Sequence, residues 1–106
     1  MHEDHKDRMS EALLSALYFT MELSKGGPNL KSLGISQQTA AFAIRSDCAE
    51  IVRGLLLGQA GGLALRLHQV TALLDAVANG RWRDAYAAVS AISSTLCETD
   101  THEPLH

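Results

Sequence analysis

The feature that most restricts how this chain can fold is an apolar stripe between residues 41 and 55. Its side chains recur at steps of three and four: Ala41, Ile44, Cys48, Ile51, Val52 and Leu55. This spacing places them on one face of an α-helix, because 3.6 residues make one turn. Ser36 stands ahead of the stripe and is a favoured helix N-cap. The sequence therefore predicts a long amphipathic helix that begins next to Ser36.

The charged residues of the same segment fall mostly on the other side of this helix. They are Arg45, Asp47, Glu50 and Arg53. Charged side chains opposite an apolar stripe are typical of a solvent-exposed face. We therefore interpret these four residues as a solvated surface rather than as a site.

Two clusters of helix-breaking residues divide the rest of the chain. Gly26-Gly27-Pro28 should stop a first helix over residues 10–25, because proline lacks the amide donor that a continuing helix needs. Asn79-Gly80 should end a helix over residues 63–78 and separate it from a last helix over residues 82–96. One face of the first helix carries Leu13, Leu14, Leu17, Tyr18 and Met21, and one face of the 63–78 helix carries Leu63, Leu67, Val70, Leu74 and Val77. In the connector after the first helix, Leu30, Leu33 and Ile35 should pack against the bundle. The last helix should bury Trp82, Tyr86, Val89, Ile92 and Leu96.

Four glycines lie between residues 54 and 62, and they permit two interpretations. If one helix continues, Gly54, Gly58 and Gly62 recur at every fourth position and form a flat strip that another helix can approach closely. That helix would lose about 1 kcal/mol for each glycine relative to alanine. If the helix ends, residues 58–62 form a turn in which glycine supplies a left-handed cap. The lower cost favours a break or a sharp bend.

Composition favours an all-α protein. Hydrophobic residues make up 46% of the 106 residues and aromatic residues only 5%, and the apolar set is mainly Ala and Leu, which favour helix over strand. We predict an all-α fold, a small bundle of three to four helices. A single helical domain is expected over residues 10–97, with a flexible N-terminal segment over 1–9 and a flexible C-terminal tail over 98–106.

Charge and hydropathy argue against several classes of partner. Lys and Arg number 9 against 12 Asp and Glu, so the formal net charge of −3 provides no overall attraction for nucleic acid phosphates or anionic lipids. No stretch reaches the ~18 uncharged apolar residues of a membrane span, and the N-terminus lacks the apolar core of a signal peptide. Cys48 and Cys97 are typical of intracellular thiols rather than of a disulfide framework. We expect a cytoplasmic protein that binds neither membrane nor nucleic acid directly.

No constellation of residues predicts catalysis. Four histidines lie in the segments expected to be flexible: His2, His5, His102 and His106. The fifth, His68, has no orienting carboxylate close in sequence, and no Cys or third His stands at the spacing of a closed zinc site. No serine stands in a strand–turn–helix elbow, and the glycines of 58–62 lack the strand and the Lys-Ser or Lys-Thr of a phosphate loop. The sequence therefore predicts no catalytic residue, no metal site and no cofactor, and a protein that is not an enzyme.

One segment, residues 33–40, imitates the turn and start of a DNA-reading helix. Gly34 would permit the turn, and residues 36–39 would face base edges. The helix that follows offers only Arg45 before acidic residues reverse the sign, whereas phosphate anchoring needs several cations. Ordinary helix capping explains the same residues. A small DNA-binding repressor that uses residues 36–45 is therefore an alternative to the main prediction.

The apolar stripes are the remaining signal for function. A chain this short, with apolar stripes on every helix, can have more apolar surface than one copy covers, and exposed apolar patches mark association sites. We predict a protein-binding regulator that uses the 41–55 stripe to contact a partner or a second copy in a symmetric dimer. Trp82 lies between two arginines and is more simply a core residue, with an interface anchor as the alternative. The predicted partner-binding residues are Ile44, Ile51, Val52, Leu55 and Trp82. A structural subunit of a larger complex is a further hypothesis.

Over residues 40–57 and 63–92, the chain resembles the QslA family, small helical antiactivators of quorum sensing in pseudomonads. The resemblance rests on size, on helical layout and on the segment Ile44-Arg45-Ser46-Asp47-Cys48-Ala49-Glu50-Ile51-Val52-Arg53-Gly54. It implies a protein that binds the ligand-binding domain of a LasR-type transcription factor, occupies its dimerisation surface and so prevents it from binding DNA. Because the resemblance includes no binding motif, no contact residue carries over from the family.

Overall fold

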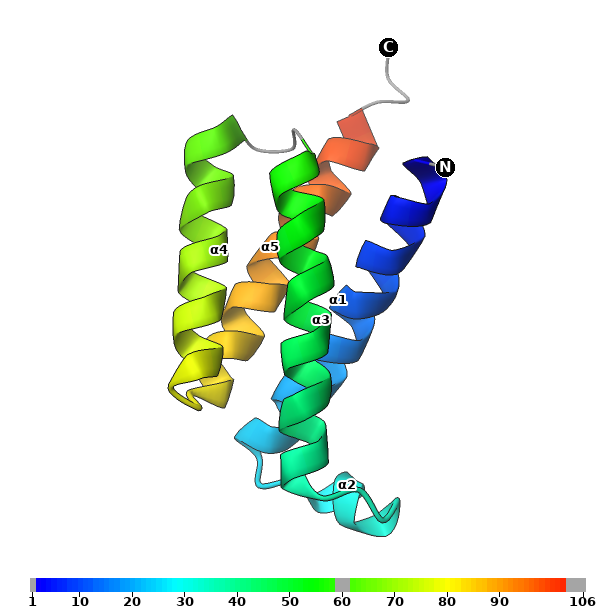
Figure 1. Ribbon diagram of the computed structural model, residues 1–106, viewed down its shortest axis with the longest axis vertical. Coiled ribbons are helices and arrows are strands. Elements are labelled where there is room, and N and C mark those ends of the chain that lie inside the picture. The colour runs from blue at the N-terminus through cyan, green and yellow to red at the C-terminus, as the bar shows by residue number, and fades with distance from the viewer. Residues whose placement is uncertain (1, 59–61, 103–106) are drawn as a thin grey trace.

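Four long helices that alternate in direction make up most of the chain (Figure 1). The structure is a computed structural model that describes residues 2–58 and 62–102, with side chains for residues 8–58 and 62–96. Within these ranges it contains no strand, and its helices are α1 (His2–Ser24), α2 (Pro28–Ser32), α3 (Gln37–Leu57), α4 (Gly62–Ala78) and α5 (Trp82–His102). The prediction of an all-α fold, a small helical bundle, is confirmed.

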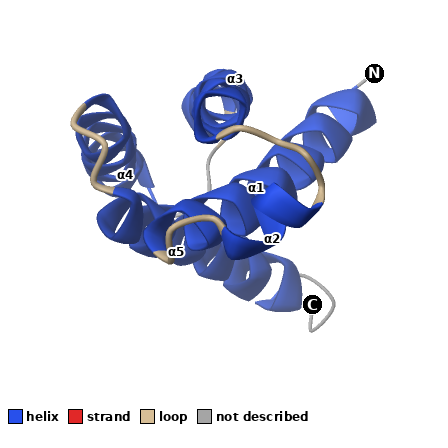
Figure 2. Ribbon diagram, turned by 90° about the horizontal axis from the view of Figure 1, so that it is seen from below, coloured by secondary structure: helices blue, strands red, loops and turns tan. Residues whose placement is uncertain are grey.

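Each long helix packs against two others. α1 contacts α3 and α5, and α4 contacts α5 and α3, so the four helices surround a common core (Figure 2). The pair α1 and α3 has the most extensive contact, and the pair α3 and α4 has less than the others. α4 is consequently the long helix that its neighbours cover least.

The core consists of the apolar stripe predicted on α3 and the side chains that cover it. Ile44 and Ile51 are completely buried, and burial of such a side chain contributes ~1.5–3 kcal/mol. The α3 side chains in the core are Ala40, Ile44, Cys48, Ile51 and Leu55, those of α1 are Met9, Ala12, Leu13, Ala16 and Leu23, those of α4 are Leu73, Ala76 and Val77, and those of α5 are Ala85, Val89 and Ile92. The apolar side chains of α3 therefore lie on one face of the helix, as their spacing predicts.

The break after α1 lies where Gly26-Gly27-Pro28 predicts it. Gly26 and Gly27 have φ values of 90° and 74°, in the left-handed region that favours glycine. The Gly27 amide donates to the Glu22 carbonyl oxygen over 2.7 Å, which closes the end of α1. Pro28 then begins α2. The amide of the first residue in a helix has no acceptor within that helix, so the lack of an amide proton in proline costs no hydrogen bond there.

The buried carboxylate of Glu22 joins α1 to α2. It accepts hydrogen bonds from the backbone amide of Asn29 over 3.0 Å and from the Asn29 side-chain amide over 2.8 Å. Leu30 of α2 enters the core and Ile35 packs against it, as predicted for the connector. Leu33, which was also expected to pack there, is exposed because the turn of α2 directs it to solvent.

The helices at the two ends of the chain are longer than their apolar patterns predict. α1 begins at His2 rather than near Ser10, and α5 continues to His102 rather than ending near Leu96. Neither extension contains a glycine or a proline, so no residue there stops a helix that has already formed. Of the segments predicted to be flexible, residue 1 and residues 103–106 lie outside the described residues.

The glycine-rich segment interrupts the helix, as the cost of helical glycine predicts. α3 ends at Leu57 and α4 begins at Gly62, while residues 59–61 lie outside the described range. Gly58 is extended, so the left-handed cap expected from this cluster does not form there. Arg66 joins the two ends: its Nη1 donates to the Leu55 carbonyl over 2.9 Å and its Nε to the Gly62 carbonyl over 3.1 Å.

Gly54, inside α3, permits the close approach of α1. The side chain of Met9 fills the space beside it, so a Cβ atom at this position would lie 3.0 Å from Met9 Cγ and 3.3 Å from Met9 Cε. Such distances are shorter than ordinary van der Waals contacts, so the side chain of Met9 would have to move to admit a larger residue at position 54. The glycine at position 54 therefore belongs to the packing of the most extensive helix pair.

We expect Gly54→Val to lower the free energy of unfolding by about 1–3 kcal/mol, because the larger side chain overpacks the contact with Met9. Urea denaturation of the wild type and the variant measures the change. In a Met9→Ala background the same substitution should cost less, because the opposing side chain is gone. An equal cost in both backgrounds would contradict this account of the α1–α3 contact.

Candidate functional site

α4 exposes large apolar side chains along most of its length. Leu63, Leu67 and Leu74 are 59%, 47% and 45% exposed, and Val70 between them is half-buried. Positions 63, 67, 70 and 74 follow steps of four, three and four, which places them on one side of the helix. This is the spacing of residues that form a contact between two helices. We call these four residues the α4 stripe.

The apolar face predicted for this helix is only partly covered, because Leu63, Leu67 and Leu74 are exposed whereas Val77 is buried. The buried residues of α4 are Gln69, Leu73, Ala76 and Val77. The apolar arc of α4 is wider than the surface that α3 and α5 cover. Periodicity alone finds the apolar arc, but it does not say which part of that arc the neighbours will occupy.

Gln69 gives a physical reason for this rotation of α4. Its side chain is only 7% exposed, and its Nε2 donates to Thr95 Oγ1 of α5 over 3.2 Å. Burial of an amide is costly unless it is hydrogen-bonded, so this bond favours one orientation of α4 against α5, even though Oε1 of the same side chain is buried without a partner. Glutamine is more often exposed than buried, so no signal in the sequence indicates that this is the covered side of α4.

α1 also carries apolar side chains that point away from the core. Leu14, Tyr18 and Met21 belong to the apolar face predicted for the first helix, but Leu14 is 69% exposed and the other two are also exposed. The buried side of α1 is the one that contains Leu13 and Ala16, because α3 and α5 both pack against that side. This second exposed row shows that the bundle leaves apolar surface on more than one helix.

The structure places most of the predicted partner-binding residues inside the chain's own core. Ile44, Ile51 and Leu55 come together there, with exposed fractions of 0%, 0% and 3%. Val52 is half-buried at the edge of the same stripe. Trp82 is partly buried and packs against the core, as the simpler interpretation of that residue had it. In this conformation a partner does not reach the first three side chains, whereas it does reach the α4 stripe.

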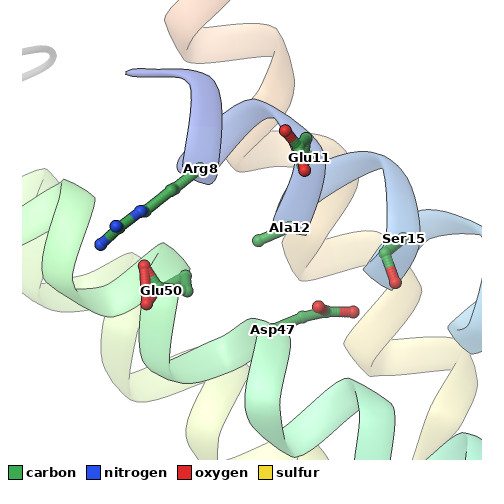
Figure 3. A pocket seen from close by; sticks show the side chains of 6 residues that line it. All are labelled: Arg8, Glu11, Ala12, Ser15, Asp47 and Glu50. Carbon is green, nitrogen blue, oxygen red and sulfur yellow. The ribbon is translucent and has the colours of Figure 1, made fainter. Parts of the chain in front are cut away.

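The charged residues of α3 do not share one solvated surface. Asp47 and Glu50 are half-buried and, together with Arg8, Glu11, Ala12 and Ser15 of α1, line an open pocket of about 370 Å³ (Figure 3). Arg45 and Arg53 are exposed, and within the described side chains neither forms an ion pair. The acidic residues of α3 are therefore turned toward α1 and the arginines away from it.

Asp47 is the polar group of this pocket that is least well satisfied. One of its carboxylate oxygens, Oδ2, is buried without a hydrogen-bond partner, while Ser15 of α1 donates a hydrogen bond to the carboxylate. Desolvation raises the pKa of Asp47 above its ordinary value of 3.8, and the bond with Ser15 opposes that shift. The pocket therefore contains one partly desolvated carboxylate, and within the described residues no group of three or more metal-ligating side chains is present.

Cys48, next to Asp47, is not suited to nucleophilic chemistry. Burial, and secondarily the charge of Asp47, raise the pKa of the thiol to about 11. The reactive form of cysteine is the thiolate, which such a shift removes at neutral pH. The thiol therefore acts as a small apolar group in the core.

The segment that imitates a DNA-reading element is used in contacts within the chain. Ser36 Oγ accepts a hydrogen bond from the Thr39 amide over 3.0 Å and caps α3, as predicted. Gln37 Nε2 donates to the Gly26 carbonyl over 3.2 Å. Both contacts agree with helix capping as the role of these residues. Among the helices the structure describes, none combines the length and the apolar character needed to cross a membrane.

Comparison of the chain with models of protein families, with curated proteins and with solved structures found no match.

We expect the stability of the chain to depend on the ionisation of Asp47. Because its pKa is higher in the folded than in the unfolded chain, the folded state binds more protons just above pH 3.8, so this residue's contribution to the free energy of unfolding falls as pH rises through that window. Asp47→Asn removes the ionisation, so urea denaturation should show the variant gaining stability relative to wild type between pH 3 and pH 7. A difference that stays constant or changes in the opposite direction would contradict the burial of this carboxylate.

Proposed function

We propose that this chain is a protein-binding regulator that contacts its partner through the α4 stripe. The observation that supports this proposal is the set of three leucines, each about half exposed, on the least covered helix of the bundle. Burying the exposed part of each would contribute on the order of 1 kcal/mol. Leucines at this spacing are suited to pack against another helix. Exposed apolar patches of this kind mark sites of association with another protein.

The partner that we propose is the ligand-binding domain of a LasR-type transcription factor. The resemblance of residues 40–57 and 63–92 to the antiactivator family suggests this partner, and the apolar character of the α4 stripe is compatible with it. A surface through which a protein forms a homodimer is more apolar than ordinary surface, so leucines are suitable side chains to cover it. A chain bound there would act stoichiometrically: it would keep the transcription factor monomeric and prevent it from binding DNA.

We expect Leu67→Glu and Leu74→Glu to weaken binding to such a domain by at least roughly ten-fold each, because each places a charge in an apolar contact. Both side chains are substantially exposed in the free chain, so the helical content and the unfolding midpoint should change little. Isothermal titration calorimetry with the purified domain measures the affinity, and circular dichroism checks the fold.

Ala72→Glu is the matched control for these variants. Ala72 is exposed and lies on α4 between the two leucines in sequence, but about half a turn away from the α4 stripe. Its substitution should leave the affinity unchanged. If the leucine variants bind as tightly as wild type, or if all three substitutions weaken binding equally, the α4 stripe is not the contact surface.

A second copy of the chain is an alternative occupant of the same stripe. In a symmetric dimer two α4 helices would cover each other's leucines, and this arrangement would replace the dimer predicted through residues 41–55, whose central side chains lie in the core. Analytical ultracentrifugation should then show a concentration-dependent dimer that Leu67→Glu shifts to monomer. A dimer that the substitution leaves intact would place the self-association on another surface.

A further inference from the structure

The outward side of α3 combines apolar and cationic side chains. Phe42 and Leu56 are 67% and 50% exposed, and Arg45, Ala49 and Arg53 between them are exposed as well. Positions 42, 45, 49, 53 and 56 follow steps of three and four, so they form one row along the helix. We call these five residues the outer α3 stripe. Its length, at 1.5 Å per residue, is about 21 Å, or roughly four helical turns.

The charge of this row is opposite to that of the chain as a whole. The chain has a formal net charge of −3, yet both charged residues of the outer α3 stripe are arginines. The acidic residues of the same helix, Asp47 and Glu50, point into the pocket against α1 (Figure 3), so they do not neutralise the row. Arg45 and Arg53 form no ion pair with any side chain that the structure describes.

We propose that the outer α3 stripe binds an acidic amphipathic helix of a partner protein. Apolar side chains of that helix would pack on Phe42 and Leu56, and its carboxylates would pair with the guanidinium groups of Arg45 and Arg53. Arginine forms two parallel hydrogen bonds with a carboxylate, and charge complementarity of this kind selects one partner over others. The inference rests on the proposed function only in that the partner is a protein, because the stripe lies on a different helix from the α4 stripe.

Charge complementarity favours an acidic protein segment over a polyanion. Binding to nucleic acid or to an anionic lipid surface needs a cluster of cations, whereas this row offers two arginines separated by two turns and flanked by apolar side chains. An amphipathic helix supplies both kinds of contact at that spacing.

The test uses the full chain and two synthetic helical peptides, each 21 residues long and fluorescently labelled. Both carry leucine at heptad positions a and d, and they differ only in having glutamate or lysine at positions e and g. Fluorescence anisotropy should show that the glutamate peptide binds, that its affinity falls as salt is raised, and that the lysine peptide binds much more weakly. The double variant Arg45→Glu/Arg53→Glu should lower the affinity for the glutamate peptide by roughly ten-fold and raise the affinity for the lysine peptide.

Lys25→Glu/Lys31→Glu is the matched control, because it makes the same two charge reversals at exposed positions outside the row. It should leave binding of the glutamate peptide unchanged. Equal binding of the two peptides, or an unchanged affinity after the double reversal, would overturn the proposal. Tighter binding of a short DNA duplex or of anionic phosphatidylserine vesicles than of the glutamate peptide would overturn it as well.

The outcome is independent of the test of the α4 stripe. If the arginine reversal does not affect the peptide while Leu67→Glu abolishes binding of the transcription factor domain, the inference about α3 fails and the proposed function stands. If the reversal switches peptide preference while the leucine variants retain full binding, the proposed use of the α4 stripe fails and the acidic-helix surface stands.

Discussion

The packing of α1 against α3 is the contact on which the rest of this structure depends. It places Ile44 and Ile51 beyond the reach of solvent, and it is so close at Gly54 that the side chain of Met9 occupies the space of a missing Cβ. The pairing also turns Asp47 and Glu50 toward α1, at the expense of a buried carboxylate oxygen without a partner. One helix pair thus uses most of the apolar surface of α3 and fixes which of its charged residues remain outside.

The surface available for binding follows from this arrangement. α1 has the most extensive contact with α3, whereas α4 has less contact with its two neighbours, α3 and α5. The hydrogen bond of the buried Gln69 amide favours the orientation of α4 in which Leu73 and Val77 point inward. The leucines at 63, 67 and 74 are then left in solvent. Large apolar side chains that one copy leaves exposed therefore lie on α4, on the outward side of α1 and, at Phe42 and Leu56, on the outward side of α3.

Local rules predict the elements of this fold better than they predict its surfaces. Gly26-Gly27-Pro28 and the Ser36 cap act through the backbone of their own segment, and both predicted a helix boundary correctly. The exposure of the α4 leucines could not be predicted in this way, because it depends on where α3 and α5 lie in space. For the same reason the stripe most clearly marked by its periodicity, with Ile44, Ile51 and Leu55, is the core rather than a binding site. A strong stripe indicates that a face is covered, but it does not say whether another helix of the same chain or a partner covers it.

The most direct test of this account is the solvent accessibility of individual methyl groups. In a methyl-labelled sample dilute enough to be monomeric, NMR signals can be compared with and without a soluble paramagnetic agent, which broadens the signals of groups that it reaches. The account predicts strong broadening for the methyl groups of Leu63, Leu67 and Leu74 and little for those of Ile44 and Ile51. Broadening of the two isoleucines with protection of the three leucines would show that the faces are reversed and would contradict it.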